Sequence, residues 1–238
     1  MQDEVTKHTR KIYREMKNPG HSFWEKFKEV TTEILIIVFA VTLSIWLHNW
    51  SDNREQQKQT GEFLAGIRVD LAKDIQIMEE NRVSFMMVER NFGFLEKLNN
   101  SGAVDTLNEH VIANHLEYEN RSTHANVARY EGFKSNGKIG SIEDDSLRQA
   151  ILLYYQQTVP TVNDEEALVN TFQTRLMEAE INRNEVQSMR VFVKSFKVRA
   201  LLVFTRQNIG PAIQEYSDAE DQARRIINLI ESYLNKRG

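Results

Sequence analysis

The sequence predicts an all-α protein, in which one N-terminal transmembrane helix continues into a long helix and an extracytoplasmic helical bundle. Three observations lead to this fold class. An apolar run, Ile34 to Leu47, is typical of a membrane-spanning helix. Large apolar residues then recur every seven residues, as on one face of a helix. Apart from residues 190–198, no segment shows the alternation of a strand.

The apolar run is shorter than the ~20 residues that a bilayer core of ~30 Å requires, but its flanks extend it. No glycine or proline interrupts residues 30–50, so we expect one transmembrane helix there. Trp24, Trp46 and Trp50 lie at its two ends, where tryptophan favours the headgroup level of a bilayer. Together with Glu33, which precedes the run, they are the predicted membrane-anchor residues.

The anchor leaves two alternatives open. Glu33 is either a functional ionisable group at membrane depth, with Lys26 or another subunit as its partner, or an interfacial residue that reaches water. The neighbouring Glu29 and Thr32 favour the interfacial position. The whole run is either a membrane helix or the core helix of a soluble domain, and its continuous apolarity and aromatic borders favour the membrane.

Basic residues predict the orientation of the anchor. Within ~20 residues, its N-terminal side carries Lys11, Arg14, Lys17, Lys26 and Lys28. Its C-terminal side carries Arg54, Lys58 and Arg68. We therefore expect residues 1–29 to be a cytoplasmic basic segment and residues 51–238 to form a helical domain outside the cytoplasm. Bulky residues stand where signal-peptide cleavage needs small ones, which predicts an uncleaved signal anchor.

Residues 50–98 contain no proline and are expected to form a long helix. Its seven-residue series consists of Leu64, Leu71, Met78, Phe85 and Phe92. The second core position of the heptad repeat is polar in two of the repeats, at Asp74 and Asn81. A coiled-coil seam should keep both positions apolar, so we favour a bundle helix within one chain over a parallel coiled coil between copies.

Turn and capping residues divide the next part of the chain. Residues 99–102 are expected to end the long helix, because Asn and Gly tolerate the left-handed conformation. Three shorter helices are then expected: one after Asp105, one over residues 123–134, and one from a cap at Ser141 or Asp144 to Val159. Pro160 lacks an N–H donor and is expected to end this helix.

Two further long helices are expected in the C-terminal part. Asn163 and the three acidic residues after it predict a helix start. Gly210-Pro211 is expected to separate this helix from a last one that reaches the C-terminus. The domain should therefore contain three long helices and several shorter ones.

Composition limits the chemistry. The 238 residues contain no cysteine, which excludes disulfides, cysteine zinc sites and thiol chemistry. The net charge of −4 gives no reason to expect nucleic-acid binding. His110 and His115 are five residues apart and do not share a helix face, so metal binding is disfavoured even with His124 nearby. No catalytic, cofactor-binding or metal-binding residue is predicted, and an enzyme is not expected.

Residues 186–214 contain five basic residues and no Asp or Glu. These residues, interleaved with apolar ones, are Arg190, Lys194, Lys197, Arg199 and Arg206. They form either a surface for anionic lipid headgroups or an acidic partner, or a solvated basic face over the bundle core.

Two motifs carry a resemblance to a known family. Residues 32–38 and 48–52 give a Glu-Ile start, an aliphatic run and an Asn-Trp end. Residues 130–139 and 147–155 give a Ser-Asn-Gly-Lys turn before a Leu-Arg helix that ends in tyrosine. These motifs resemble an uncharacterised domain-of-unknown-function family of single-pass Bacteroidota membrane proteins, although Thr32 replaces the family's usual Gly. The resemblance implies an inner-membrane protein with a helical periplasmic domain and implies no activity.

The expected function follows from this organisation. We expect a protein in the inner (cytoplasmic) membrane, with its N-terminus cytoplasmic and its C-terminal domain periplasmic. The domain should serve protein–protein interaction, scaffolding or signal reception without catalysis or cofactors. Its expected partners are the lipid bilayer and a protein partner or further copies of the chain. The alternative is an oligomeric membrane assembly that forms a pore, with Glu33 lining its axis, or a force-transmitting stalk.

Overall fold

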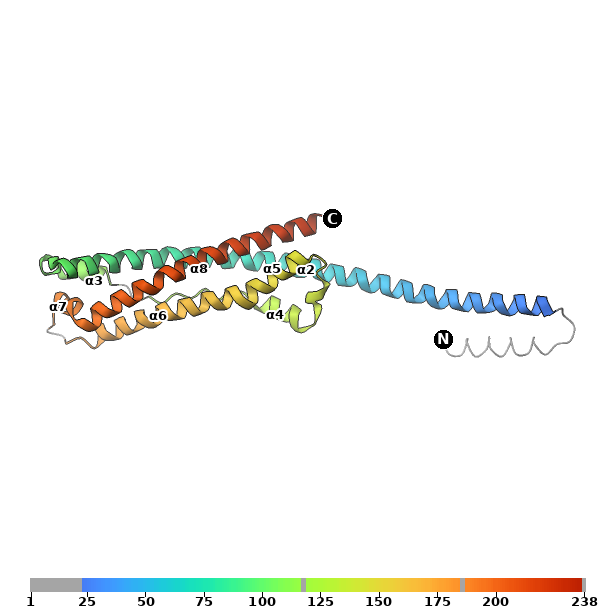
Figure 1. The fold of residues 1–238 in the computed structure, drawn as a ribbon, viewed down its shortest axis with the longest axis horizontal. Helices are drawn as coiled ribbons and strands as arrows, with labels where there is room; N and C mark the ends of the chain where they lie inside the picture. The colour runs from blue at the N-terminus through green and yellow to red at the C-terminus, as the bar shows by residue number, and fades with distance from the viewer. Residues whose placement is uncertain (1–22, 117–118, 185–186, 237–238) are drawn as a thin grey trace. The chain divides into compact units, whose positions relative to one another are not determined.

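The computed structural model describes residues 23–116, 119–184 and 187–236 (Figure 1). Within these ranges every regular element is a helix, which confirms the all-α prediction. The chain divides into two compact units, residues 1–58 (unit 1) and residues 59–238 (unit 2). The predictions for Lys11, Arg14, Lys17 and residue 186, and for the side chain of Lys26, lie outside the described residues.

Unit 1 contains the candidate membrane-spanning segment. Helix α2, Phe23–Ser101, begins in this unit and is continuous into unit 2. Its most apolar 18-residue window has a mean hydropathy of 2.2, and none of that window is buried. The Thr42 and Ser44 hydroxyls donate to carbonyl oxygens of the preceding turn, with bonds of 2.8 Å from Thr42 to Val38 and from Ser44 to Ala40. These two hydroxyls therefore need no partner outside the helix.

Unit 2 is built on three long helices, the predicted number: the rest of α2, α6 (Val159–Ile181) and α8 (Phe196–Asn235). The prediction that the second of them runs on to Gly210-Pro211 is wrong, because α6 ends at Ile181 and α8 begins at Phe196. Arg68 of α2 pairs with Glu231 of α8, and Glu96 of α2 pairs with Arg206 of α8. Residue numbers therefore rise along α2 as they fall along α8, so these two helices are antiparallel. Thr158, the last residue of η3 before α6, bonds to Gln222 of α8, and Glu166 of α6 bonds to Tyr216 of α8, so α6 and α8 are antiparallel as well. Helices α2 and α6 are therefore parallel, and the chain between them must return along the bundle.

Shorter helices form the connections. They are η1 (Ala103–Thr106), α3 (Glu109–Asn114), α4 (Ala128–Ser135), η2 (Lys138–Ser141), α5 (Asp145–Leu153), the π-helical η3 (Tyr154–Thr158) and α7 (Met189–Lys194). Gly102 and Gly137 adopt φ angles of 74° and 69°, the left-handed conformation expected at helix ends. Asp144 caps α5 as predicted, because its Oδ1 accepts from the Leu147 N–H at 3.0 Å.

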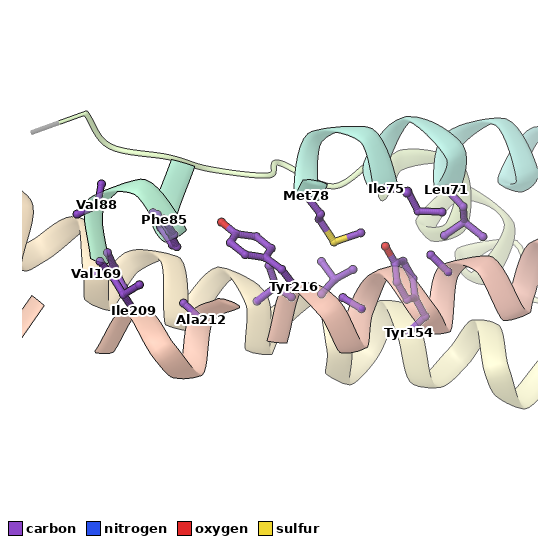
Figure 2. Close-up of a cluster of buried hydrophobic side chains, with 14 of the residues drawn as sticks. Leu71, Ile75, Met78, Phe85, Val88, Tyr154, Val169, Ile209, Ala212 and Tyr216 are labelled. Carbon is purple, nitrogen blue, oxygen red and sulfur yellow. The ribbon is translucent and has the colours of Figure 1, made fainter. Parts of the chain in front are cut away.

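The heptad series of α2 lies in the core. Its five apolar residues are at most 2% exposed. The Phe85 ring lies 5.7 Å from the ring of Tyr216 in α8, centroid to centroid, and Figure 2 shows Met78 between Tyr216 and Tyr154, the first residue of η3. One chain therefore covers the seam of α2 by itself, as the bundle interpretation requires.

Two predicted breaks are wrong. Helix α6 passes through Pro160, because the π-helical turn η3 widens the helix just before it and places the proline in the first turn of α6, where its missing N–H costs little. Helix α8 likewise continues through Pro211. Pro211 leaves the carbonyl oxygen of Gln207 without a helical donor, but Gln207 is exposed, so water can bond to that oxygen. Ile209 and Ala212 on either side pack into the core and hold the helix together.

A third prediction, a helix over residues 123–134, is partly wrong. Helix α4 begins only at Ala128, and residues 119–127 form an extended connection instead. This connecting segment supplies the return path between α2 and α6. Its backbone bonds to side chains of both helices, which gives it partners that a helix would not need.

Candidate functional site

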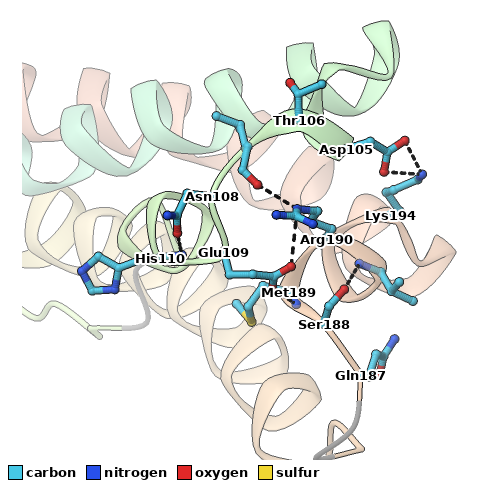
Figure 3. A network of polar contacts seen from close by, with 12 residues as sticks. Asp105, Thr106, Asn108, Glu109, His110, Gln187, Ser188, Met189, Arg190 and Lys194 are labelled. Atoms are coloured by element: carbon cyan, nitrogen blue, oxygen red, sulfur yellow. Dashed lines mark hydrogen bonds and ion pairs between the residues drawn. The ribbon is translucent and has the colours of Figure 1, made fainter.

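The basic residues at the start of the C-terminal part are largely paired within the chain. Arg190 of α7 donates from Nε to the Leu107 carbonyl oxygen at 2.7 Å and lies 3.5 Å from Glu109 Oε1 (Figure 3). Lys194 Nζ lies 2.9 Å from both carboxylate oxygens of Asp105. These two cations tie α7 to the η1–α3 connection, a role that sequence spacing alone could not reveal.

The other three basic residues lie on α8. Arg206 pairs with Glu96 of α2. Arg199 makes only a long hydrogen bond, 3.4 Å, to the neutral Asn100 amide oxygen. Within the described part of the chain, Lys197 and Arg199 are exposed and have no carboxylate partner. The predicted basic surface is thus reduced to two cations in the first turn of α8.

A groove of about 400 Å³ lies beside this turn. It runs between the end of α2 and the start of α8, and it is lined by Glu96, Asn99, Asn100, Phe196, Arg199, Ala200, Leu202, Val203 and Phe204. Phe196 is 89% exposed and Phe204 is 49% exposed. The groove combines apolar walls with an exposed cation, the composition typical of ligand and partner sites.

Local sequence explains why α8 starts here. Ser195 has an extended backbone, and its hydroxyl accepts from the Val198 N–H, so it acts as the N-cap. No acidic residue stands in the first turn of α8. The positive end of the helix dipole is therefore reinforced by Lys197 and Arg199 instead of being neutralised.

The predicted anchor residues lie in unit 1. Trp24, Trp46 and Trp50 are 76%, 61% and 51% exposed within the single chain. The Arg54 guanidinium lies 4.9 Å from the ring centroid of Trp50, a cation–π contact at the end of the apolar stretch. Glu33 is half-buried at the start of that stretch. The anchor residues thus belong to a different unit from the groove.

A buried polar cluster, which the sequence did not predict, holds the connecting segment. Asp74 and Asn81, the two residues that interrupt the heptad series of α2, are 0% and 7% exposed. Asp74 accepts from the Asn126 backbone N–H at 3.1 Å and from its side-chain amide at a short distance. Asn81 donates to the Thr123 hydroxyl at 3.4 Å. The interruptions are therefore the residues that bind the connecting segment to α2.

Glu166 of α6 completes this cluster. Its carboxylate accepts from the Thr123 N–H at 2.9 Å and from the Tyr216 hydroxyl at 2.8 Å, and also from the Thr123 hydroxyl. Sequence reasoning placed Glu166 at a helix start, but the residue is 3% exposed and lies inside α6. The carboxylate is saturated by donors of its own chain, so its geometry suits structural support of the connecting segment.

The cluster alters the titration of two of its members. Burial raises the pKa of Asp74, although the Asn126 hydrogen bonds oppose that shift. Burial also raises the pKa of Tyr216, and the nearby Glu166 carboxylate raises it further. Tyr216 therefore stays protonated and donates its hydrogen bond at any physiological pH.

The three histidines considered for metal binding do not converge. His115 stacks on Phe94 with ring centroids 4.5 Å apart, and its Nδ1 lies 2.8 Å from the Val111 carbonyl oxygen. His110 and His124 are exposed. In the ranges that the structure describes, no group of three or more His, Asp or Glu residues is arranged to hold a metal ion.

Comparison of the chain with protein-family models, curated proteins and solved structures finds no match.

Proposed function

We propose that this protein is a single-pass protein of the inner membrane, in which unit 2 is a non-catalytic module for protein interaction or signal reception in the periplasm. The N-terminus would be cytoplasmic. One observation carries the second part of the proposal: the three most exposed large apolar side chains described in unit 2, Phe196, Ile181 and Val191, all lie between the end of α6 and the start of α8. Exposed apolar groups gathered at one end are typical of interaction sites.

Exposure also supports the membrane anchor. Ile36 and Phe39 are 62% and 67% exposed, whereas the core helix of a soluble protein buries such side chains. A cleaved signal sequence needs small residues after its apolar region, and His48, Asn49 and Trp50 stand there instead. The N-terminal flank of the anchor carries more basic residues than its C-terminal flank, which favours a cytoplasmic N-terminus.

Cysteine labelling tests the topology cleanly, because the chain has no cysteine of its own. We expect Asp218→Cys, at an exposed site of α8, to react with a membrane-impermeant maleimide after the outer membrane is permeabilised. Gln2→Cys should react only after the inner membrane is lysed. Labelling in the reverse order, or release of the protein by alkaline carbonate, would refute the proposed membrane topology.

The interaction role has a separate test. A photo-crosslinking amino acid placed at Val191 should give a discrete adduct in cells, because that side chain lies at the proposed surface. The same amino acid at Asp218, also exposed but remote from α7, is the matched control. Identical patterns of adducts at both sites would contradict a localised interaction surface.

A further inference from the structure

The groove between the end of α2 and the start of α8 separates apolar and cationic groups. We propose that it binds a single-chain amphiphile with an anionic headgroup, such as a fatty acid. This inference rests on the proposed reception role of unit 2 and names the class of ligand received at that surface. The ligand would place its tail along α8 and its headgroup at Arg199.

The apolar wall is a second stripe on α8. Phe196, Ala200, Val203 and Phe204 follow the spacing of one helix face, and they line the groove. The core-facing stripe is separate and includes Val198, which is 1% exposed. From Arg199 to Phe204 this wall extends about 8 Å along the helix, and the exposed Gln207 follows it. The wall can therefore cover the first part of an acyl chain whose headgroup lies at Arg199.

The cationic group of the groove is Arg199. Its guanidinium lines the groove, is exposed, and bonds only weakly to Asn100. The groove also contains the carboxylate of Glu96, but Arg206 neutralises that charge. Lys197 and the amino end of α8 add positive potential. An anionic headgroup is therefore favoured over a neutral or cationic one.

The size and layout of the groove favour an amphiphile over a protein segment. Its volume of about 400 Å³ falls within the range of small-molecule sites, ~300–1,000 Å³. Its apolar stripe ends after two turns, while its polar residues gather on α2 and at the start of α8. A ligand with one tail and one charged head matches this segregation, and an acidic peptide that binds here in its place would contradict the proposal.

Photolabelling of the full chain in phosphatidylcholine nanodiscs provides the test. The probe is dodecanoic acid with a diazirine on its tail, and labelled tryptic peptides are identified by mass spectrometry. We expect label on the peptide Ala200–Arg206, which lines the groove. Dodecanoate should compete for this label, and dodecyltrimethylammonium, with the same tail and the opposite charge, should not. Label on the apolar anchor reports probe dissolved in the bilayer and serves as the internal reference.

Two variants and one control complete the test. Arg199→Glu should lower groove labelling, relative to the anchor, by about tenfold, the effect of losing a charge-assisted contact. In this variant the label is measured on the peptide of residues 198–206, because trypsin no longer cleaves after residue 199. Phe196→Ala should lower it as well, and because Phe196 is almost fully exposed this variant should keep the fold. Arg225→Glu makes the same charge change at an exposed site elsewhere on α8 and should leave labelling unchanged.

Each contrary result overturns the amphiphile site. These results are label confined to the anchor, equal competition by the cationic and anionic amphiphiles, or labelling that Arg199→Glu and Arg225→Glu reduce equally. A protein that fails the topology test above can still label at the groove, so failure of the membrane proposal and failure of the ligand proposal give different outcomes.

Discussion

Glu166 joins three parts of unit 2 through a single carboxylate. It accepts hydrogen bonds from the connecting segment at Thr123 and from α8 at Tyr216, and it belongs to α6. Water cannot replace these bonds, because all three residues are at most 3% exposed. Removal of this carboxylate should cost more free energy of unfolding than removal of a surface partner, because it leaves buried donors without an acceptor.

Glu166→Ala should therefore destabilise unit 2 by about 3 kcal/mol, because it leaves the Thr123 N–H and the Tyr216 hydroxyl buried without an acceptor. The free energy of unfolding can be measured by urea-dependent pulse proteolysis of the full chain in mild detergent. Asp164→Ala, at an exposed position two residues earlier, is the control and should change stability by less than ~0.5 kcal/mol. Equal effects of both substitutions would contradict the role assigned to Glu166.

Asp74 predicts a pH dependence of stability. Burial raises its pKa in the folded state above the ordinary value of 3.8, so the folded chain holds this proton more tightly than the unfolded chain. The contribution of Asp74 is therefore fully present at low pH and is lost as pH rises through the folded-state pKa. Asp74→Asn, which keeps an acceptor for Asn126, should gain stability relative to the wild type as pH rises from about 4.

The measurement is the difference in unfolding free energy between Asp74→Asn and the wild type, followed by pulse proteolysis across that pH range. The difference cancels the carboxylates that the two proteins share. A difference that stays constant with pH, or that moves in favour of the wild type as pH rises, would show that the Asp74 carboxyl is not held in the protonated form by its surroundings.

At the scale of elements, the sequence predicts helices better than it predicts their partners. The seven-residue series of α2 identifies its buried face correctly, because the repeat reflects one helix alone. Asp74 and Asn81 are visible in the sequence as interruptions, but their partners lie more than 40 residues away in an extended segment. Sequence spacing contains no signal for that pairing.

The two prolines mark the limit of local rules. The sequence predicts helix ends at Pro160 and Pro211, yet Pro160 fits into the first turn of α6 after η3, and α8 continues through Pro211 because its flanks pack into the core. The same limit affects the basic segment, in which Arg190 and Lys194 read as a surface but pair with Glu109 and Asp105 of a distant connection. The cations left without a carboxylate can be identified only when these long-range pairs are known.

If packing holds α8 together across Pro211, the proline itself should cost stability. Pro211→Ala supplies the missing N–H to the Gln207 carbonyl and should stabilise unit 2 by about 1–2 kcal/mol, after the entropy that proline removes from the unfolded chain is subtracted. Pro211→Gly supplies the same donor with a more flexible unfolded chain and should gain less. Urea-dependent pulse proteolysis measures both. Destabilisation by Pro211→Ala would indicate that the helix needs the bend that proline provides.

The connecting segment should depend on the polar interruptions of α2. Replacing both Asp74 and Asn81 with Leu completes the heptad series but removes the acceptor for Asn126 and the donor to Thr123. We expect trypsin to cleave this variant faster at Arg121, which lies within the segment. Lys73→Leu, at an exposed position of α2, is the control. Unchanged cleavage at Arg121 would contradict a clamping role for the two residues.

At the scale of the whole molecule, one helix, α2, belongs to two units that bury their residues differently. Residues 51–58 are exposed on every side, whereas Thr60 and Phe63 are already buried in unit 2. Two parts of a chain unfold together only when they bury residues against each other. The exposed stretch of α2 should therefore couple the unfolding of unit 1 to that of unit 2 only weakly. The two units are therefore expected to fold independently, although their backbone is continuous.

Proline substitution in α2 tests this independence. Asn53→Pro, in the exposed stretch, should break the helix locally but change the global hydrogen-exchange protection of α8 amides by less than ~0.5 kcal/mol. Glu80→Pro makes the same change at an exposed site within unit 2 and should reduce that protection by about 3 kcal/mol, because α2 is there part of the bundle core. Similar losses from both substitutions would mean that the anchor and the bundle unfold as one body. Since the proposed reception of a ligand by unit 2 does not require rigid coupling to the anchor, labelling of the groove should persist in Asn53→Pro.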